Sequence, residues 1–113
     1  MNRVIIIGGG AAGGMAAYMA AGYGAQAVLL ESTPRLMNKV RITGKGRCNL
    51  TNACGTEAFL AHIIHNPRFF RSAFARYDNQ WLMELFETLG VPLKVERGQR
   101  VFPQSDRAHD VAD

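Results

Sequence analysis

Three glycines spaced as Gly8-x-Gly10-x-x-Gly13 are the residues whose types and spacing most clearly predict a chemical function. Where a strand turns sharply into a helix, the first glycine permits the turn, the second lets a phosphate approach the backbone, and the third lets helix and strand pack closely. The helix would leave unpaired N–H groups and the positive end of its dipole facing whatever lies over the turn. The spacing therefore predicts a pyrophosphate-binding turn.

A carboxylate follows at the distance that such sites use. Glu31 lies 18 residues beyond Gly13, at the expected end of a second strand. In that place a carboxylate can accept hydrogen bonds from both hydroxyls of an adenosine ribose, and its charge disfavours the 2′-phosphate of NADP. The glycines and the acid together predict a dinucleotide site.

The elements that would position these residues form a βαβ unit. Val4 to Ile7 is a run of β-branched residues too short for a helix, and it predicts a buried parallel strand. A run of small residues predicts a helix that extends to about Tyr23 and is closed by Gly24, and Ala27 to Leu30 predicts the second strand. Such a unit crosses over right-handed, with the helix on one face of the sheet.

A basic segment follows the acid. Ser32 to Arg47 contains five basic residues and no acidic one. Two interpretations stay open, a solvated loop or a segment that contacts a bound diphosphate or ring system. Within it, Thr43 to Gly46 lacks the spacing of a P-loop. Its two glycines are expected to bring the backbone against a flat ligand or another loop.

The second half predicts helices and a short hairpin. One helix is expected to begin at Asn66-Pro67 and another to be capped by Asp78. The aromatic residues of both repeat with helical spacing and are interpreted as core rather than as a base-stacking platform. Two short strands with a turn at Gly98 are expected next, and Ser105 is expected to cap a final helix over Asp106 to Asp113.

Composition narrows the class of protein. The chain has 113 residues, 48% hydrophobic and 19% charged, which predicts one globular domain rather than disorder. No apolar run has the length of a membrane span, and the N-terminal apolar run predicts a strand rather than a secretory signal. Two cysteines without an export signal predict a cytoplasmic protein with free thiols. The net charge of +4 is compatible with a nucleic acid or an anionic ligand.

Neither a metal site nor a catalytic group can be assigned from the sequence. His62 and His65 could share a helix face, but no third ligand follows at metal spacing, so no metal is predicted. Cys48 and Cys54 lack the Cys-x-x-Cys spacing of redox and zinc motifs. No Ser/His/Asp arrangement can be picked out.

Several motifs resemble a known family. From Gly8 to Glu31 the chain follows the extended FAD fingerprint, with Ala17 and Gly24 at the expected intervals. The segment Arg41 to Asn52, RITGKGRCNLTN, is similar to the signature of the bacterial aminoacetone-oxidase-like FAD-dependent oxidoreductases, a family that includes a bile-acid-pathway flavoprotein. Further motifs similar to that family are Asn66-Pro67-Arg68-Phe69, Leu89-Gly90-Val91-Pro92, and Arg100-Val101-Phe102-Pro103 followed by Ser105-Asp106.

This resemblance implies an α/β fold, the N-terminal βαβ part of a glutathione-reductase-like (Rossmann-type) FAD-binding domain, followed by helices and a short β-hairpin. Residues 1–113 would form one incomplete domain, with the βαβ unit at 1–31, a flavin-side loop at 32–56, and a helical and hairpin insertion at 57–113. The residues implied for the pyrophosphate are Gly8, Gly10, Ala11, Ala12 and Gly13. Those implied for the rest of the cofactor are Glu31, Ser32, Lys39, Gly46, Arg47, Cys48 and Asn49.

The resemblance also implies redox chemistry at the flavin of FAD, with NAD(P)H as a candidate electron donor of the complete protein. The expected partners are FAD and a small-molecule substrate, with no nucleic acid and no membrane; substrate, electron acceptor and oligomeric state are left open. The alternatives are an NAD-linked Rossmann dehydrogenase fragment and a non-catalytic remnant. A nucleic-acid-binding module is a further alternative that rests on the net charge alone.

Three departures from the family pattern stand out. Gly14 replaces a residue that is usually larger and apolar, and Met37-Asn38 replaces a glycine followed by a basic residue. Family members are also several times longer. We therefore expect an N-terminal fragment or the product of a truncated gene, which by itself binds FAD weakly or not at all.

Overall fold

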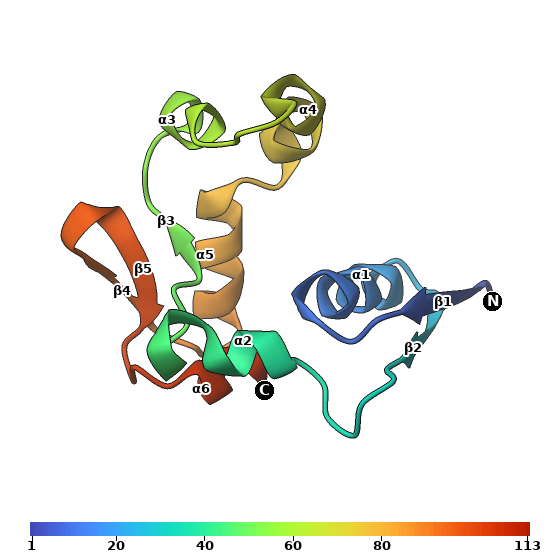
Figure 1. The fold of residues 1–113 in the computed structure, drawn as a ribbon. Helices are drawn as coiled ribbons and strands as arrows, with labels where there is room; N and C mark the ends of the chain where they lie inside the picture. Colours follow the sequence, from blue (N-terminus) through green and yellow to red (C-terminus); the bar gives the residue numbers. More distant parts are fainter.

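The computed structural model describes all 113 residues and contains two sheets on opposite sides of the molecule (Figure 1). Strands β1 (Arg3–Ile7) and β2 (Gln26–Leu30) form a parallel pair. Strands β3 (Thr51–Asn52), β4 (Leu93–Glu96) and β5 (Arg100–Pro103) form an antiparallel sheet in the order β3-β5-β4. The molecule is thus mixed α/β, with a parallel start and a separate small antiparallel sheet.

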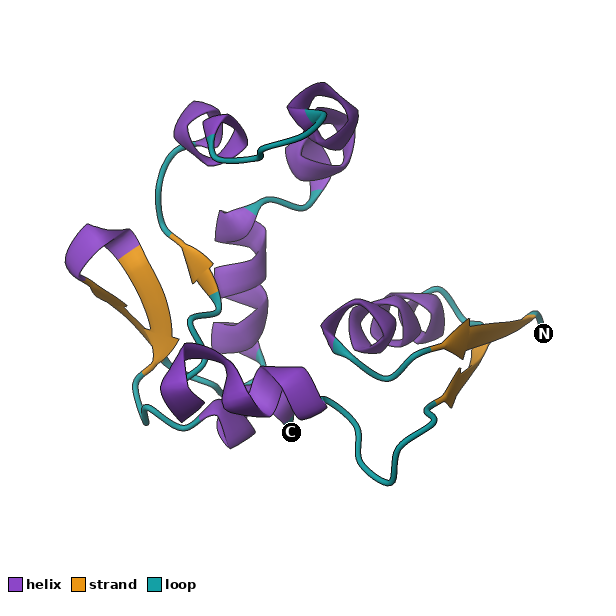
Figure 2. Cartoon of the chain, viewed as in Figure 1, coloured by secondary structure: helices purple, strands orange, loops and turns teal.

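Helices make up most of the remaining chain (Figure 2). They are α1 (Ala11–Gly22), α2 (Asn38–Ile42), α3 (Thr56–Ala61), α4 (Pro67–Arg76), α5 (Asn79–Thr88) and α6 (Ala108–Ala112), with 3₁₀ turns at Thr43–Gly46 and Arg97–Gln99. None of them has both the length and the apolar character that crossing a bilayer requires.

The βαβ unit has the predicted order and nearly the predicted bounds. Strands β1 and β2 pair in register, with Ile6 opposite Leu29. Helix α1 ends at Gly22, and Gly24 follows with φ of +87°, a backbone conformation that favours glycine. The predicted fold class is therefore confirmed.

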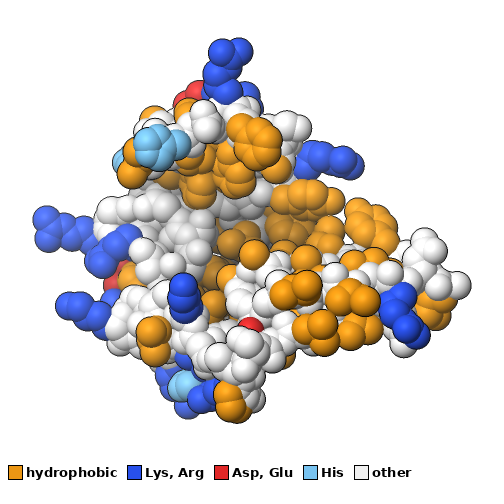
Figure 3. All heavy atoms as spheres, turned by 45° about the vertical axis from the view of Figure 1, so that its right-hand side comes forward, with side chains coloured by type: hydrophobic (Ala, Val, Ile, Leu, Met, Phe, Trp, Pro, Cys, Tyr) orange, Lys and Arg blue, Asp and Glu red, His pale blue; other side chains and the backbone are white.

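The prediction that β1 is buried is wrong, because Ile6 is half-buried and the other four residues of the strand are exposed. Ile6 lies toward α1, because its Cγ2 is 3.4 Å from an ideal Cβ placed on Gly13. Ile5 and Ile7 point to the other face and are 60% and 87% exposed. A single crossover helix covers only one side of a parallel pair. Figure 3 shows hydrophobic side chains gathered on the side of the molecule that carries this unit.

The core lies in the second half of the chain. Val101 and Phe102 of β5 are buried completely or almost so, as are Leu60 and Phe74. The rings of Phe59 on α3 and Phe74 on α4 stack with centroids 4.5 Å apart. These residues come from three elements, so burial here depends on packing that is distant in the sequence.

Two helix starts differ in how they are capped. Asp78 accepts a hydrogen bond from the backbone N–H of Trp81 at 2.8 Å, as predicted for an N-cap. Asn66 does precede α4 and Pro67 does begin it, but the Asn66 side chain makes no capping bond. The expectation that the α4 aromatics are core fails for Phe69 and Phe70, which are 88% and 39% exposed, while Phe74 is buried.

The final helix begins later than predicted. It starts at Ala108 rather than at Asp106, and Ser105 is not its N-cap. Asp106 has φ of +58°, and its N–H donates to the carbonyl oxygen of Pro103 at 3.0 Å, so this residue closes a turn. The Ser105 hydroxyl accepts from the N–H of Arg107 at 3.2 Å within that turn.

The basic segment is more ordered than a loop. It contains helix α2 and the Thr43–Gly46 turn. Gly44 lies against the backbone of its own segment, because a Cβ there would come within 2.7 Å of the backbone nitrogen of Asn49. The expected contact of these glycines with a flat ligand or another loop stays a prediction.

A cluster of two cations and two carboxylates joins this segment to the hairpin. Arg47 pairs with Glu96 and Asp106, and Lys94 pairs with the same two acids, with nitrogen–oxygen distances of 2.8 Å to Asp106 in both cases. Hydrogen bonding from Arg47 and then Lys94 lowers the pKa of Glu96, and the pKa of Asp106 is lowered by Lys94 and then Arg47. The Lys94–Glu96 contact lies within β4, whereas the contacts of Arg47 with Glu96 and Asp106 and that of Lys94 with Asp106 join separate segments, so these three fix the relative positions of the segments.

We predict that the cluster makes the fold sensitive to acid. Because Glu96 and Asp106 have lowered pKa values in the folded state, their contribution to stability is complete above their unfolded pKa values, at about pH 4. It is lost as the pH falls through the folded values. Urea unfolding followed by Trp81 fluorescence should show a smaller acid-induced loss of stability in an E96Q/D106N double variant than in the wild type.

The matched control is Glu84→Gln, because Glu84 is an exposed acid of α5 that belongs to no ion pair. This control should lose stability on acidification just as the wild type does. An equal loss in the E96Q/D106N variant would contradict the prediction.

Candidate functional site

The turn from β1 into α1 depends on two of its glycines. Gly8 has φ of +107°, and its N–H donates to the carbonyl oxygen of Leu30 on β2 at 2.8 Å. A Cβ at Gly13 would overlap the carbonyl oxygen of Gly8. Only glycine at position 13 lets α1 lie this close to the strand, which is the geometry of a dinucleotide-binding turn.

The first residues of α1 carry N–H groups without acceptors. The first bond of the helix runs from the N–H of Gly14 to the carbonyl oxygen of Gly10, at 2.9 Å. The N–H groups of Gly10, Ala11, Ala12 and Gly13 have no hydrogen-bond partner, and no side chain caps the helix. No atom lies within 4 Å of an ideal Cβ on Gly10. These groups are therefore accessible to an anion, which the helix dipole also favours.

The Glu31 carboxylate lies directly beside this turn. Its Oε1 accepts a hydrogen bond from the N–H of Gly9 at 2.8 Å. Its Oε2 accepts from the N–H and the hydroxyl of Thr33, at 2.9 and 2.6 Å. These bonds, that of the Thr33 hydroxyl first, hold the pKa of Glu31 below its usual value. Since each carboxylate oxygen can accept two bonds, Oε1 keeps one acceptor site for a ligand hydroxyl.

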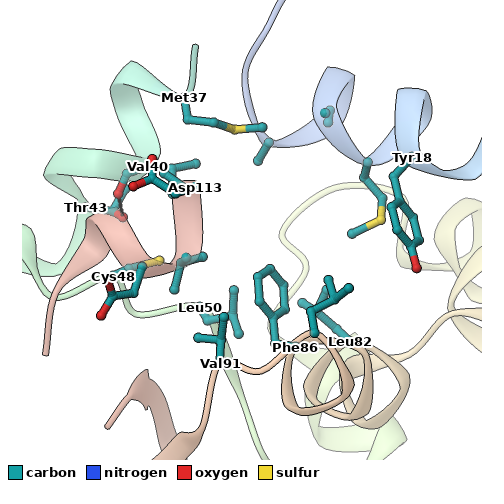
Figure 4. A pocket seen from close by; sticks show the side chains of 18 of the residues that line it. Tyr18, Met37, Val40, Thr43, Cys48, Leu50, Leu82, Phe86, Val91 and Asp113 are labelled. Atoms are coloured by element: carbon teal, nitrogen blue, oxygen red, sulfur yellow. Dashed lines mark hydrogen bonds between the residues drawn. The ribbon is translucent and has the colours of Figure 1, made fainter. Parts of the chain in front are cut away.

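A cavity of about 780 Å³ opens beside α1 and lies between this helix and α2, α5 and α6 (Figure 4). Most of the residues that line it are apolar. Ala11, Met15 and Tyr18 form its wall on α1, and Phe86 on α5 points into it from the opposite side. Ala11 and Ala12 belong both to the cavity and to the start of α1, so the glycine turn leads directly into this space.

The segment after α2 contributes to this cavity only in part. Cys48 and Asn49 line it, whereas Arg47 does not. The Arg47 guanidinium is held by Glu96 and Asp106, and its carbon lies 3.9 Å from the centroid of the Phe102 ring. In this structure Arg47 thus fixes the segment that bears Cys48 and Asn49.

Cys48 is buried, with φ of +62°, in the wall of the cavity. Burial raises the pKa of its thiol, against a smaller opposite effect of a hydrogen bond with Thr43. A thiol of this kind is a poor nucleophile at neutral pH. Cys54 is also free, and no group of three or more His, Cys, Asp or Glu side chains is arranged to hold a metal ion.

The residues proposed from the sequence therefore fall into three groups. Those at the start of α1 and Glu31 lie together around the glycine turn, and two residues of the later motif lie at the cavity. The remaining ones contact neither: the side chains of Ser32 and Lys39 are exposed, and Gly46 and Arg47 do not line the cavity. Their part in binding a cofactor stays a prediction.

Sequence reasoning missed several residues of the site. Gly9 is buried and ties the turn to Glu31, although it falls outside the Gly-x-Gly-x-x-Gly spacing. Met15 and Tyr18 follow Ala11 on one face of α1 with helical spacing, and both could have been found from that pattern. Phe86 comes from a distant helix, and no local signal in the sequence connects it with the turn.

Known proteins match this chain along its length. A family described as "HI0933-like protein Rossmann domain" matches residues 2–113. The 3-dehydro-bile acid delta(4,6)-reductase of Clostridium scindens is 40% identical over 117 residues, which cover 100% of this chain and 27% of that protein. The ribosomal RNA dihydrouridine synthases of Haemophilus influenzae and Escherichia coli are 36% and 38% identical over 87 residues, which cover 77% of this chain and 21% of each synthase.

This chain thus spans about a quarter of the length of these curated relatives. The family match includes both the glycine turn and the segment that bears Cys48 and Asn49. It agrees with the resemblance found in the motifs and with the parallel βαβ start of the fold. The chain therefore belongs to the HI0933-like Rossmann-domain family, a family of oxidoreductase type.

Proposed function

We propose that residues 1–113 form the FAD-binding part of a flavin-dependent oxidoreductase. The observation that carries this proposal is the group of four unpaired N–H groups at the start of α1, beside an ionised Glu31. A pyrophosphate would supply the acceptors that these groups lack, and it would take the place of the missing side-chain cap. The close approach of Gly13 to Gly8 gives the backbone the shape that such a ligand needs.

The structure supports one orientation of the cofactor. Glu31 lies beside the turn but does not line the cavity, whereas Ala11 and Ala12 belong to both the turn and the cavity. The adenosine ribose would therefore bind at the free acceptor site of Glu31, and the flavin end would extend along α1 into the apolar space. Cys48 and Asn49 would then lie on the flavin side, as their motif implies.

Bound FAD would supply electron transfer at its isoalloxazine ring, while this chain supplies binding and orientation. The apolar wall formed by Met15, Tyr18 and Phe86 would exclude water from one end of the ligand. We propose residues 1–31 for the pyrophosphate and ribose, 32–56 for the flavin side, and 57–113 for the outer wall of the cavity.

The names of the relatives support a class of reaction. A delta(4,6)-reductase and a dihydrouridine synthase are both named for adding hydrogen to an unsaturated substrate. We propose that the whole protein reduces a carbon–carbon double bond, for which bound reduced FAD would supply the hydride and water or an acidic group the proton, with NAD(P)H as the candidate donor that would reduce the flavin again. The substrate itself is not identified by the residues of this chain.

The affinity of the 113-residue chain for FAD is expected to be weak. The cavity is open, and Ile5 and Ile7 leave an apolar sheet face uncovered. NAD would use the same turn and the same acid, so an NAD-linked dehydrogenase is the alternative. A parallel titration with FAD and NAD separates the two, because the large tricyclic ring system of FAD suits the apolar cavity better than the smaller, positively charged nicotinamide ring of NAD.

RNA is a second candidate as the substrate of the whole protein. Two of the relatives are named for a reaction on ribosomal RNA, and this chain has a net charge of +4. Figure 3 shows Lys and Arg side chains projecting around the rim of the molecule. Scattered cations of this kind would contact phosphates without reading a sequence.

We predict that Gly10→Ala weakens FAD binding without destabilising the chain. Gly10 has φ of −87°, which suits any residue, and no atom lies within 4 Å of the added Cβ. The change in unfolding free energy should therefore stay within about 0.5 kcal/mol. A bound pyrophosphate would meet the methyl group, so the affinity measured by flavin fluorescence should fall about tenfold, or about 1.4 kcal/mol.

Gly22→Ala is the matched control for this experiment. It lies in the same helix, and its added Cβ also meets nothing within 4 Å, but it lies far from the turn in sequence. Its FAD affinity should equal that of the wild type. If Gly10→Ala binds FAD as tightly as the wild type, the pyrophosphate does not bind at this turn and the prediction is wrong.

We predict that Glu31→Gln weakens the binding of ligands that contain adenosine. The amide keeps the size of the side chain but loses the negative charge of the carboxylate. That charge strengthens the hydrogen bonds that its oxygen atoms accept from the N–H of Gly9 and would accept from the ribose hydroxyl. Isothermal titration should show several-fold weaker binding of FAD and of ADP, with no change for FMN, which lacks the adenosine. Equal losses for FMN and ADP would place the effect in the fold rather than at the ribose.

If RNA is a substrate, the isolated chain should retain an RNA oligonucleotide in a manner that depends steeply on salt. Each phosphate contact adds to the slope of log affinity against log salt concentration. Filter binding between about 50 and 500 mM salt measures that slope. Undetectable retention at the lowest salt, or retention that does not change with salt, would show that residues 1–113 do not contribute to binding an RNA substrate.

A further inference from the structure

Gly14 on α1 and Met37 at the start of α2 lie in direct contact. A Cβ at position 14 would overlap the terminal methyl carbon of Met37 and would lie 3.7 Å from its sulfur. The methyl group of Met37 thus occupies the position that the Cβ atom of any residue other than glycine would take at position 14. Figure 4 shows the Met37 side chain extending from the α2 segment toward α1.

The backbone of Met37 is held on both sides, so its side chain starts from a fixed point. Its N–H donates to the carbonyl oxygen of Gly9 at 2.8 Å, and its own carbonyl oxygen accepts from Arg41 at 3.0 Å. Its φ of +63° lies in the left-handed region, which is costly for a residue with a Cβ. Only the flexible outer part of this side chain is able to move.

Gly14 and Met37 are also both wall residues of the cavity, at the end where it meets the glycine turn. Ala11 and Ala12 line the same end. A methionine has three rotatable bonds and readily changes shape. If its methyl group were displaced from Gly14, the open volume next to it is the cavity itself.

We propose that Gly14 and Met37 act as one coupled pair that sets the width of the passage from the glycine turn into the cavity. Gly14 provides the space that keeps the Met37 side chain out of the passage, which makes Gly14 a positioning residue for the ring end of the cofactor. This inference rests on the proposed function. It concerns only the part of the ligand beyond the pyrophosphate.

The binding test compares four variants with two ligands. Gly14→Ala should displace Met37 into the passage and weaken FAD binding about tenfold, while ADP, which has no flavin end, should bind within about twofold of the wild type. Met37→Ala should not weaken FAD binding. The G14A/M37A double variant should recover the wild-type affinity for FAD within about threefold, because the obstructing side chain is gone.

Gly22→Ala is the matched control, because it adds the same methyl group to the same helix without a neighbour within 4 Å. It should bind FAD and ADP as the wild type does. Two results would overturn the proposal: wild-type FAD affinity in Gly14→Ala, or a double variant that binds FAD as weakly as Gly14→Ala. An equal loss of ADP affinity would also overturn it, because the effect would then lie at the turn.

A second measurement separates this inference from the proposed function. Of the five methionines, Met15 and Met37 line the cavity, whereas Met1, Met19 and Met83 do not. With ¹³C-methyl-labelled methionine, Gly14→Ala should shift the Met37 methyl resonance and create a new nuclear Overhauser contact between the Met37 and Met15 methyl groups. The resonances of Met1 and Met83 should stay in place.

This spectrum requires no bound cofactor. If the wild-type chain fails to bind FAD but the Met37 resonance responds as described, the proposed function is wrong for this chain. The coupling of Gly14 and Met37 is then supported without it. If FAD binds and the Met37 resonance is unchanged in Gly14→Ala, the coupled pair is wrong and the FAD site stands.

Discussion

The close approach of α1 to β1 at Gly13 is the contact on which the rest of the site depends. Any side chain there would overlap the carbonyl oxygen of Gly8 and push the helix away from the strand. With glycine, the first turn of α1 begins directly above the end of β1, and its unpaired N–H groups gather at one point. The same placement turns the face with Ala11, Met15 and Tyr18 toward the second half of the molecule, where the cavity forms.

Charged side chains then fix the two sides of this space by different means. Glu31 accepts hydrogen bonds from Gly9 and Thr33, and these bonds stiffen the turn that would hold the pyrophosphate. The residue that we expect to bind the ribose therefore also orders the neighbouring turn. Arg47 belongs to an ion cluster with the hairpin and lies on the Phe102 ring, so it positions Cys48 and Asn49 through the backbone. Both arrangements order the site before a ligand arrives, which lowers the cost of binding.

Much of the fold and part of the site could be predicted because local rules decide them. The β-branched run before Gly8, the capping by Asp78 and the turn at Gly98 each depend on a few neighbouring residues. Errors occurred where a distant partner intervened. The start of α6 moved to Ala108 because Asp106, taken up by Arg47 and Lys94, closes a turn instead of beginning a helix.

The sequence by itself determined the dinucleotide turn and the acid beside it, because spacing along one βαβ unit fixes where these groups lie. It also marked Gly14 and Met37 as separate departures from the family pattern. Only the tertiary structure joined them, since their contact depends on how the segment after β2 folds back onto α1. The cavity was decided in the same way: its walls come from helices far apart in the chain, and their packing has no local signature.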